Sequence, residues 1–347
     1  MSEITISKDG ALGRITLNRP DALNAVTFDM VAAMSAALPA FAADDKVAML
    51  VIDAAGDRAF CAGGDIVEIY AALKAGDPEV ARAFWRAEYR LNAALFTFPK
   101  PVASFLQGFT MGGGVGVGCH ASHRIVGASS QIAMPEVSIG LVPDVGGSLL
   151  LARAPGWVGE YLGVTATRMS AGDAIFAGFA DYYIDEALWP DLIDRLVKTG
   201  DWEAIDRAAT PRPASKIEAQ LTDINTFFDG ETMHDTVVQL EAATSDFAHA
   251  SLEKIARNAP LAMAGAMELV HRARVRDRIE DALKQEFRFA YRLATQGDFQ
   301  EGIRAAIIDK DRTPKWAHDA PGRPSAMEVA QMLFPLGPEE LSLEGMI

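Results

Sequence analysis

The sequence predicts an α/β protein built around a largely parallel sheet. Two observations lead to this prediction: half of the 347 residues are hydrophobic, and in the first half of the chain short apolar runs alternate with amphipathic helical patterns. Strands that alternate with helices favour parallel pairing, because each connection crosses a face of the sheet. A chain of this length buries about three quarters of its unfolded surface, so its core can be stable without disulfides.

The N-terminal elements follow in order along the chain. Residues 4–7 and 13–17 flank a Lys-Asp-Gly turn, which predicts a β-hairpin. Thr27 is placed to cap a helix over residues 28–41, and Asp29 is favourable in its first turn. Further strands are predicted at residues 46–53, 101–107, 124–127 and 179–184.

The second half of the chain has a helical character. β-Branched runs become scarce after residues 189–201, and the tail from residue 313 is rich in Pro and Gly. Apolar periodicity predicts helices over residues 215–228, 234–243, 245–258, 261–278, 279–295 and 326–334. We therefore predict a core of residues 1–200 and a helical C-terminal region of residues 201–347.

The composition argues against several classes of protein. Lys and Arg number 32 against 47 Asp and Glu, a net charge of −15, which disfavours a nucleic-acid partner bound through its phosphates. No apolar run reaches the length of about 18 residues that a membrane span needs. The N-terminus has neither a secretory nor a transit pattern, and two Cys cannot form a disulfide framework. We therefore expect an acidic protein of the cytoplasm.

Two glycine-rich segments, residues 60–65 (FCAGGD) and 111–118 (MGGGVGVG), each follow predicted strands. Paired glycines let the backbone approach a ligand closely, and Asp65 can cap a helix over residues 66–74. A tight turn with a helix cap is the alternative interpretation of the first segment. Two such segments can also supply two convergent backbone N–H groups, an oxyanion hole that stabilises charge on a carbonyl oxygen.

Glu136 and Asp144 each follow a proline within residues 134–147 (MPEVSIGLVPDVGG). Proline fixes φ, so each acid lies on a stiff segment, and apolar surroundings disfavour the charged form of a carboxyl group. Such acids suit general acid–base or nucleophilic chemistry. The alternative is that each acid caps a short helix.

No cofactor motif is present. The sequence has neither a P-loop nor a Gly-x-Ser-x-Gly elbow, and its six His lack metal-ligand spacing. Cys61 and Cys119 lie beside the glycine segments, and we interpret both as small buried residues in preference to nucleophiles. Arg19 and Lys100 are candidates for binding an anionic ligand.

Several motifs together resemble the crotonase (enoyl-CoA hydratase/isomerase) superfamily, and within it the branch of 3-hydroxyisobutyryl-CoA hydrolases. The motifs are LNRPDALNA (17–25), FCAGGDI (60–66), RAEYRLN (86–92), MGGGVG (111–116) and MPEVSIGLVPDVGG (134–147). The resemblance runs from about residue 4 to residue 316. It implies a crotonase-like spiral of ββα units with a helical C-terminal region.

The resemblance also implies roles for individual residues. The backbone N–H groups of Gly64 and Gly113 would hold the thioester oxygen of an acyl-CoA. Gly116 lies where hydratases of the family place one of two catalytic glutamates, so the usual pair of acids is broken. Glu136 matches the second family glutamate.

Two further acids match the hydrolase branch. Asp144 lies where that branch has Asp, and Glu88 matches an acid that contacts the substrate there. From the residues alone, Glu88 faces solvent or pairs with Arg86 or Arg90 on an amphipathic helix over residues 82–90.

The implied activity is hydrolysis of a short β-hydroxyacyl-CoA, as in valine catabolism, to the free acid and CoA. Glu136 would attack the acyl carbon or activate a water, Asp144 would orient the water or the substrate hydroxyl, and Glu88 would contact the acyl group. The alternatives are a hydratase or isomerase with rearranged acids and a non-catalytic acyl-CoA-binding protein. CoA enters only as part of the substrate, with no other cofactor. A homo-oligomer is expected unless the helical tail covers that surface.

Overall fold

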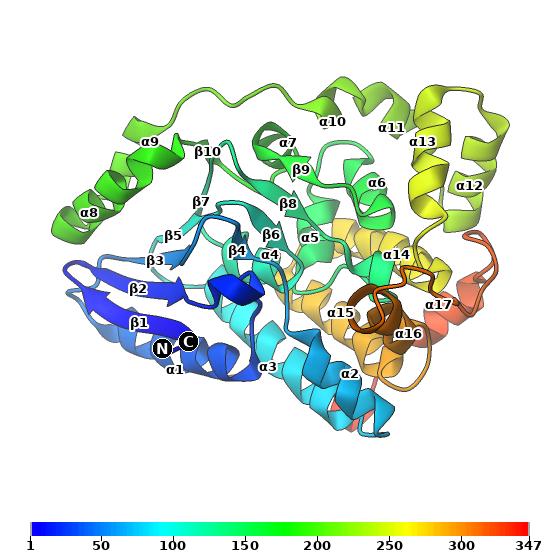
Figure 1. Ribbon diagram of the computed structural model, residues 1–347, viewed down its shortest axis with the longest axis horizontal. Coiled ribbons are helices and arrows are strands. Elements are labelled where there is room, and N and C mark those ends of the chain that lie inside the picture. The colour runs from blue at the N-terminus through cyan, green and yellow to red at the C-terminus, as the bar shows by residue number, and fades with distance from the viewer. Residues whose placement is uncertain (1, 346–347) are drawn as a thin grey trace.

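Two sheets surrounded by helices form the fold in the computed structural model, which describes residues 2–345 (Figure 1). One sheet has six strands in the order β1-β2-β3-β5-β7-β10, and the other has four in the order β4-β6-β8-β9. The strands are β1 (Ile4–Asp9), β2 (Leu12–Leu17), β3 (Met49–Ala54), β4 (Ala59–Cys61), β5 (Val102–Phe105), β6 (Phe109–Met111), β7 (His123–Val126), β8 (Gln131–Ala133), β9 (Met169–Ser170) and β10 (Tyr182–Tyr183).

The six-stranded sheet confirms the predicted hairpin and the predicted parallel core. β1 and β2 pair antiparallel, and every pairing from β2 to β10 is parallel. Both faces are covered, as parallel strands require. Leu50 and Ile52 of β3 face one apolar cluster, whereas Met49 and Val51 face a second cluster that contains α8 (Trp189–Thr199).

The four-stranded sheet was not predicted from the sequence. Its strands are two or three residues long, too short to show the alternation that identifies a strand. β4 and β6 pair parallel, with Cys61 opposite Thr110. Because β4 and β6 each lead directly into a glycine-rich segment, their pairing brings the two glycine-rich segments together.

Most predicted helices are confirmed, although their ends shift by a few residues. Thr27 caps α1 by accepting from Met30 N at 3.3 Å, and Asp65 caps α2 by accepting from Val67 N. The single helix predicted over residues 215–228 is wrong, because the chain breaks at Gln220 into α10 and α11. Besides α8, the helices are α1 (Phe28–Ala43), α2 (Ile66–Lys74), α3 (Glu79–Phe96), α4 (Gly113–Gly118), α5 (Gly147–Ala152), α6 (Val158–Thr165), α7 (Ala171–Phe176), α9 (Glu203–Ala208), α10 (Lys216–Ala219), α11 (Leu221–Phe227), α12 (Met233–Ala242), α13 (Asp246–Ile255), α14 (Pro260–Arg276), α15 (Ile279–Leu293), α16 (Phe299–Ile303) and α17 (Ala326–Met332).

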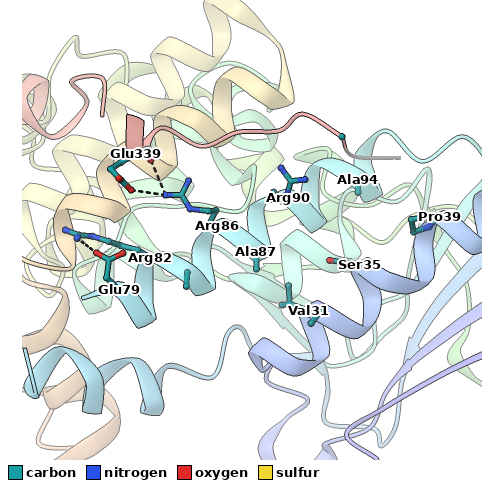
Figure 2. A pocket seen from close by; sticks show the side chains of 13 residues that line it. Val31, Ser35, Pro39, Glu79, Arg82, Arg86, Ala87, Arg90, Ala94 and Glu339 are labelled. Carbon is teal, nitrogen blue, oxygen red and sulfur yellow. Dashed lines mark hydrogen bonds and ion pairs between the residues drawn. The ribbon is translucent and has the colours of Figure 1, made fainter. Parts of the chain in front are cut away.

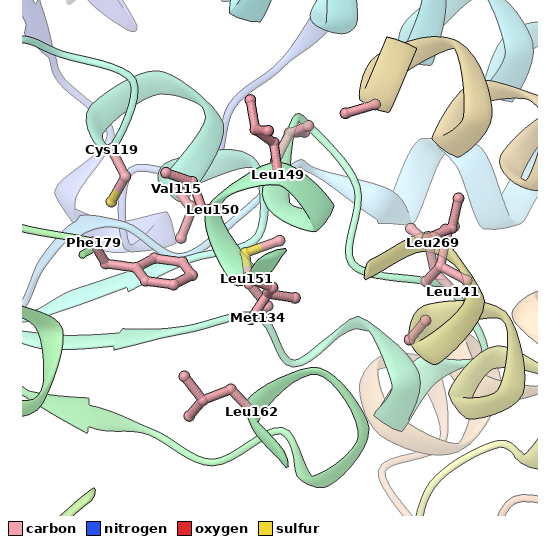
Figure 3. Close-up of a cluster of buried hydrophobic side chains, with 14 of the residues drawn as sticks. Val115, Cys119, Met134, Leu141, Leu149, Leu150, Leu151, Leu162, Phe179 and Leu269 are labelled. Carbon is pink, nitrogen blue, oxygen red and sulfur yellow. The ribbon is translucent and has the colours of Figure 1, made fainter. Parts of the chain in front are cut away.

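The main apolar cluster joins the N-terminal and C-terminal parts of the chain. Figure 3 shows Leu151 of α5 beside Met134, with Leu149 of the same helix and Leu269 of α14 in the same cluster. α14 packs against α5 and α6, and α3 packs against α1, α2, α4 and α15. The division into residues 1–200 and 201–347 stays a prediction. Among residues 2–345, no helix is long and apolar enough to cross a membrane.

Candidate active site

The two glycine-rich bends meet at one point. A Cβ built on Gly113 would lie 3.1 Å from Gly64 N, and one built on Gly63 would lie 4.0 Å from Gly113 N. Gly112, with φ +51°, turns the chain from β6 into α4 in a conformation that favours glycine. The first bend is held by Val26, which donates to Gly63 O at 2.9 Å and accepts from Asp65 N at 2.8 Å.

The backbone N–H groups of Gly64 and Gly113 are free. Within residues 2–345, neither group donates a hydrogen bond to a carbonyl or to a side chain. Nearly all buried N–H groups in proteins are paired, so two adjacent free donors at one cavity are a position for a ligand oxygen.

Three acids surround these amides, and the glycines make room for two of them. A Cβ on Gly113 would lie 2.6 Å from Glu88 Oε1, and one on Gly112 would lie 2.6 Å from Glu136 Oε1. Glu88 comes from α3, and Glu136 begins the 3₁₀ helix η2 (Glu136–Ile139). Asp144 follows η2 and accepts a hydrogen bond from Tyr89 Oη at 2.6 Å.

The acids line a small cavity of about 100 Å³ together with both glycine bends. Glu88, Glu136 and Asp144 are 3%, 5% and 4% exposed, so the alternative that Glu88 faces solvent is excluded. Glu88 Oε1 and Glu136 Oε2 have no hydrogen-bond partner among the described residues. The apolar part of the wall consists of Ile66, Phe84, Trp85, Pro135, Ile139, Leu141 and Phe299.

Burial changes the protonation of all three acids. It raises the pKa of Glu88 and of Glu136 well above the usual value, and the nearby Asp144 carboxyl raises both further. Burial raises the pKa of Asp144 to about 7, although the hydrogen bond from Tyr89 opposes the shift. Raised pKa values at several carboxyls of one cavity are typical of sites for acid–base chemistry.

Gly116 faces α3 at a point where a side chain has no space. A Cβ there would lie 2.6 Å from Asn92 Nδ2 and 2.7 Å from Val145 Cβ. Asn92 is fully buried, and neither atom of its amide has a partner among residues 2–345. A carboxyl side chain at position 116 of α4 would therefore have no space, because Asn92 of α3 and Val145 already occupy it.

The remaining candidates from the sequence lie elsewhere or are already paired. Burial raises the pKa of Cys61 and of Cys119 to about 12, which keeps both as thiols. Lys100 Nζ donates to Phe41 O at 2.8 Å and to Asp44 O at 2.7 Å, so it caps the end of α1. Arg19 forms ion pairs with Glu3 and Asp65.

Three residues near the cavity were not singled out from the sequence. Tyr89 directly follows Glu88 in the motif RAEYRLN, and nothing in the sequence indicates that it contacts Asp144, which lies 55 residues further along the chain. Phe299 of α16 reaches the cavity from the C-terminal region, and its ring centroid lies 5.5 Å from that of Trp85. Glu286 of α15 accepts from Gly146 N at 2.7 Å. Glu286 comes from a helix whose amphipathic pattern also explains it as an ordinary residue of that helix, and Phe299 lies in a segment where no helix was predicted.

Larger hollows lie outside this cavity. One of about 600 Å³ lies between α1, α3 and the C-terminal segment (Figure 2). There Arg86 and Arg90 donate to main-chain carbonyls of residues 339–344, on the face of α3 opposite Glu88. A second of about 700 Å³ is lined by several acids and meets the site cavity at Phe84. Neither combines free amides with buried acids, so the small cavity is the candidate active site.

Comparisons with known proteins identify the family. The profile of the enoyl-CoA hydratase/isomerase family matches residues 12–333, and the chain belongs to this family. The family match and the similarity to solved structures of an enoyl-CoA hydratase and a carnitinyl-CoA dehydratase confirm the predicted superfamily and fold class.

The similar proteins carry three different descriptions. The mitochondrial 3-hydroxyisobutyryl-CoA hydrolase of Gallus gallus is 34% identical over 99% of this chain and 91% of its own length. The Homo sapiens protein of the same name is 33% identical over 90% of this chain and 84% of its own. Among solved structures, an enoyl-CoA hydratase from Rhodobacter sphaeroides is 50% identical, with a TM-score of 0.93 over 98% of this chain and 100% of that one. A carnitinyl-CoA dehydratase from Mycobacterium thermoresistibile is 38% identical, with a TM-score of 0.94 over 99% and 100%.

Proposed function

We propose that this protein hydrolyses the thioester of a short β-hydroxyacyl-CoA, of the 3-hydroxyisobutyryl-CoA type, to the free acid and CoA. The observation that carries the proposal is the pair of free amides of Gly64 and Gly113 beside three buried carboxyls. The 3-hydroxyisobutyryl-CoA hydrolases that match nearly the whole chain support the same reaction.

The two amides would bind the thioester oxygen and stabilise the negative charge that develops on it during attack. Because neither N–H group donates to an acceptor among residues 2–345, no protein hydrogen bond of the described chain has to break before the thioester oxygen binds. Losing one such donor typically costs about 10²–10³ in rate.

Glu136 would carry the attack by one of two routes. As nucleophile, its carboxylate adds to the acyl carbon, the C–S bond breaks, CoA leaves as a thiolate that takes up a proton, and water then cleaves the acyl-Glu136 anhydride. As general base, Glu136 takes a proton from a water that adds to the acyl carbon, and the C–S bond then breaks with protonation of the sulfur. Both routes yield one carboxylic acid and one thiol per water.

Asp144 and Glu88 would orient the polar part of the acyl group. A carboxyl accepts hydrogen bonds when ionised and can also donate one when protonated, so either group could hold a β-hydroxyl or a water; burial raises the pKa of both. Tyr89, which donates to Asp144, restricts the rotation of that carboxyl.

A hydratase or isomerase that uses Glu136 with Glu88 or Asp144 is the second candidate. The Rhodobacter sphaeroides structure, described as an enoyl-CoA hydratase and 50% identical, favours it. The packing around Gly116 excludes the hydratase arrangement with an acid at that position, because Asn92 and Val145 fill the space, so a hydratase here would have to use Glu88 or Asp144 instead.

A panel of acyl-CoAs tests both candidates in one experiment. Thiol release is followed with a thiol reagent for 3-hydroxyisobutyryl-CoA, 3-hydroxybutyryl-CoA and crotonyl-CoA, and loss of the double bond is followed by absorbance. We expect thiol release from the hydroxyacyl esters, and loss of it in Glu136→Gln. Loss of crotonyl absorbance without thiol would favour the hydratase, and binding without either signal would favour a non-catalytic protein. Label from heavy-oxygen water in the Glu136 carboxyl after a single turnover would select the nucleophilic route.

We also propose that the reaction belongs to valine catabolism, in the cytoplasm, and that the protein forms a homo-oligomer. The substrate in the names of the hydrolase relatives supports the first point. The same names assign the animal relatives to mitochondria, which speaks against the second point. Fractionation of the source cells and light scattering of the purified protein test the other two.

A further inference from the structure

The segment that carries Asp144 has an unfavourable backbone. Val145 and Gly146 directly after it have φ values of +54° and +81°, both in the left-handed region. A β-branched residue rarely adopts this conformation, and such positions persist only where surrounding contacts hold them. The turn between Asp144 and α5 must therefore be fixed by other parts of the molecule.

Buried side chains from distant elements hold this turn. His120 Nε2 lies 2.7 Å from Val145 O. Glu286, from α15, accepts from Gly146 N at 2.7 Å with one oxygen and from Ser148 N at 3.0 Å with the other. Ser148 Oγ also donates to Glu286.

Glu286 is unusual as a helix cap. It lies 140 residues after Gly146 in the sequence, although caps normally come from the residue just before the helix. Its side chain is 0% exposed, and no cationic side chain of residues 2–345 forms an ion pair with it. Burial raises its pKa to about 7, while the donors from Ser148 and Gly146 oppose the shift. Burying a carboxyl without a cationic partner costs free energy. A Ser or Asn directly before the helix could cap it without that cost, so capping alone explains Glu286 poorly.

We propose that Glu286 is a positioning residue for the reaction: by binding the main chain of residues 146–148, it fixes the carboxyl of Asp144 at the cavity. Glu286 does not line that cavity, so it acts through the turn and not on the substrate. The inference rests on the proposed function in that Asp144 is taken to act at the reacting centre. It also gives the C-terminal region a role at a site whose other acids precede residue 145.

The variant Glu286→Gln tests this role while keeping the shape of the side chain. The amide NH₂ cannot accept from a backbone N–H, so one of the two main-chain contacts is lost. We expect kcat for thiol release to fall about 10- to 100-fold, as small misplacements of a reacting group do, with KM changed less than about threefold. Ser148→Ala, which removes only the hydroxyl donor, is the milder second variant and should lower kcat several-fold.

Asp173→Asn is the matched control. Asp173 is 4% exposed and likewise anchors a distant main chain, accepting from Ser215 Oγ at 2.7 Å and Ile217 N at 3.0 Å. We expect Asp173→Asn to lower the melting temperature as Glu286→Gln does, with kcat within about twofold of the wild type. Equal kcat values in the two variants would overturn the positioning role.

Two further measurements complete the test. In the Asp144→Asn background, adding Glu286→Gln should lower kcat less than about threefold, because the group through which it acts is already changed. A full multiplicative loss would overturn the proposal. If the wild type releases no thiol from any acyl-CoA, the proposed function fails, but the carboxyl ¹³C resonance of Asp144 still reports on its position. An unchanged resonance in Glu286→Gln would then overturn the role of Glu286 by itself.

Discussion

Adding a single methyl group at Gly113 is the sharpest perturbation of the site. A Cβ there would lie 2.6 Å from Glu88 Oε1 and 3.1 Å from Gly64 N. An oxygen that accepts from an oxyanion-hole amide lies about 2.7–3.1 Å from its nitrogen, so the methyl would compete for the same space. Glu88 would also have to move.

We expect Gly113→Ala to lower kcat for thiol release by about 10²–10³, equivalent to about 2.7–4 kcal/mol, the cost of one oxyanion donor. The assay is thiol release under saturating hydroxyacyl-CoA, with melting temperature measured in parallel. The effect should appear mainly in kcat, because the donors act on charge that develops in the transition state.

Gly64→Ala provides the comparison at the other amide. Its Cβ would contact only the Phe84 ring, at 3.3 Å, and its φ is not in the left-handed region. We therefore expect a loss at least tenfold smaller than that of Gly113→Ala. Equal losses, or a Gly113→Ala enzyme with normal kcat, would refute the assignment of the oxyanion position.

Three further predictions concern other parts of the cavity. The pKa of about 7 for Asp144 means that the folded state holds the carboxyl proton more tightly than the unfolded state does. The stabilising contribution of this proton is therefore present below about pH 4 and is lost as pH rises through 7. Melting temperatures at pH 5 and pH 8 should differ less for Asp144→Asn than for the wild type. Phe299→Ala opens the cavity wall beside Trp85, so hydrolysis of hexanoyl-CoA should rise relative to that of 3-hydroxyisobutyryl-CoA. The free energy of unfolding should fall by about 3–5 kcal/mol in thermal unfolding. An unchanged substrate preference would show that Phe299 does not contact the acyl group. Gly116→Glu should destabilise the protein by at least about 1–3 kcal/mol through overpacking and yield no hydration of crotonyl-CoA, and a stable variant with hydratase activity would contradict this.

The sequence predicted the long elements better than the connections between them, and the structure brings the candidate site residues Gly64, Gly113, Glu88, Glu136 and Asp144 to one cavity. The N-terminal hairpin, α1 with its Thr27 cap and the parallel strands follow from periodicity and capping, which depend on neighbouring residues. The short strands β4 and β6 carry too few residues for periodicity, yet their pairing is what joins the two glycine bends.

Contacts between distant residues could not be predicted. Tyr89 and Glu286 reach the Asp144 segment from α3 and α15, and both sit at positions that also fit ordinary amphipathic helices. Nothing local distinguishes a buried Glu that binds a remote turn from a Glu on a solvent-exposed face. Only the tertiary structure shows that Glu286 accepts from the first N–H groups of α5, a role that was the alternative interpretation of Asp144.

The glycine run at residues 112–116 has a function in packing as well as in hydrogen bonding. Three of its glycines each admit a polar side chain from another element: Glu136 at Gly112, Glu88 at Gly113 and Asn92 at Gly116. Glu88 and Asn92 are one helical turn apart on α3, and Gly113 and Gly116 are three residues apart on α4, so the two helices meet along matched faces. A carboxyl from α3 can therefore lie beside the amides of Gly64 and Gly113 only because α4 has no side chain at either position. The packing of α3 on α4 leaves no space for an acid at position 116 and brings Glu88 into the cavity. The cavity therefore contains Glu88 in place of the α4 glutamate that the resemblance to hydratases would lead one to expect.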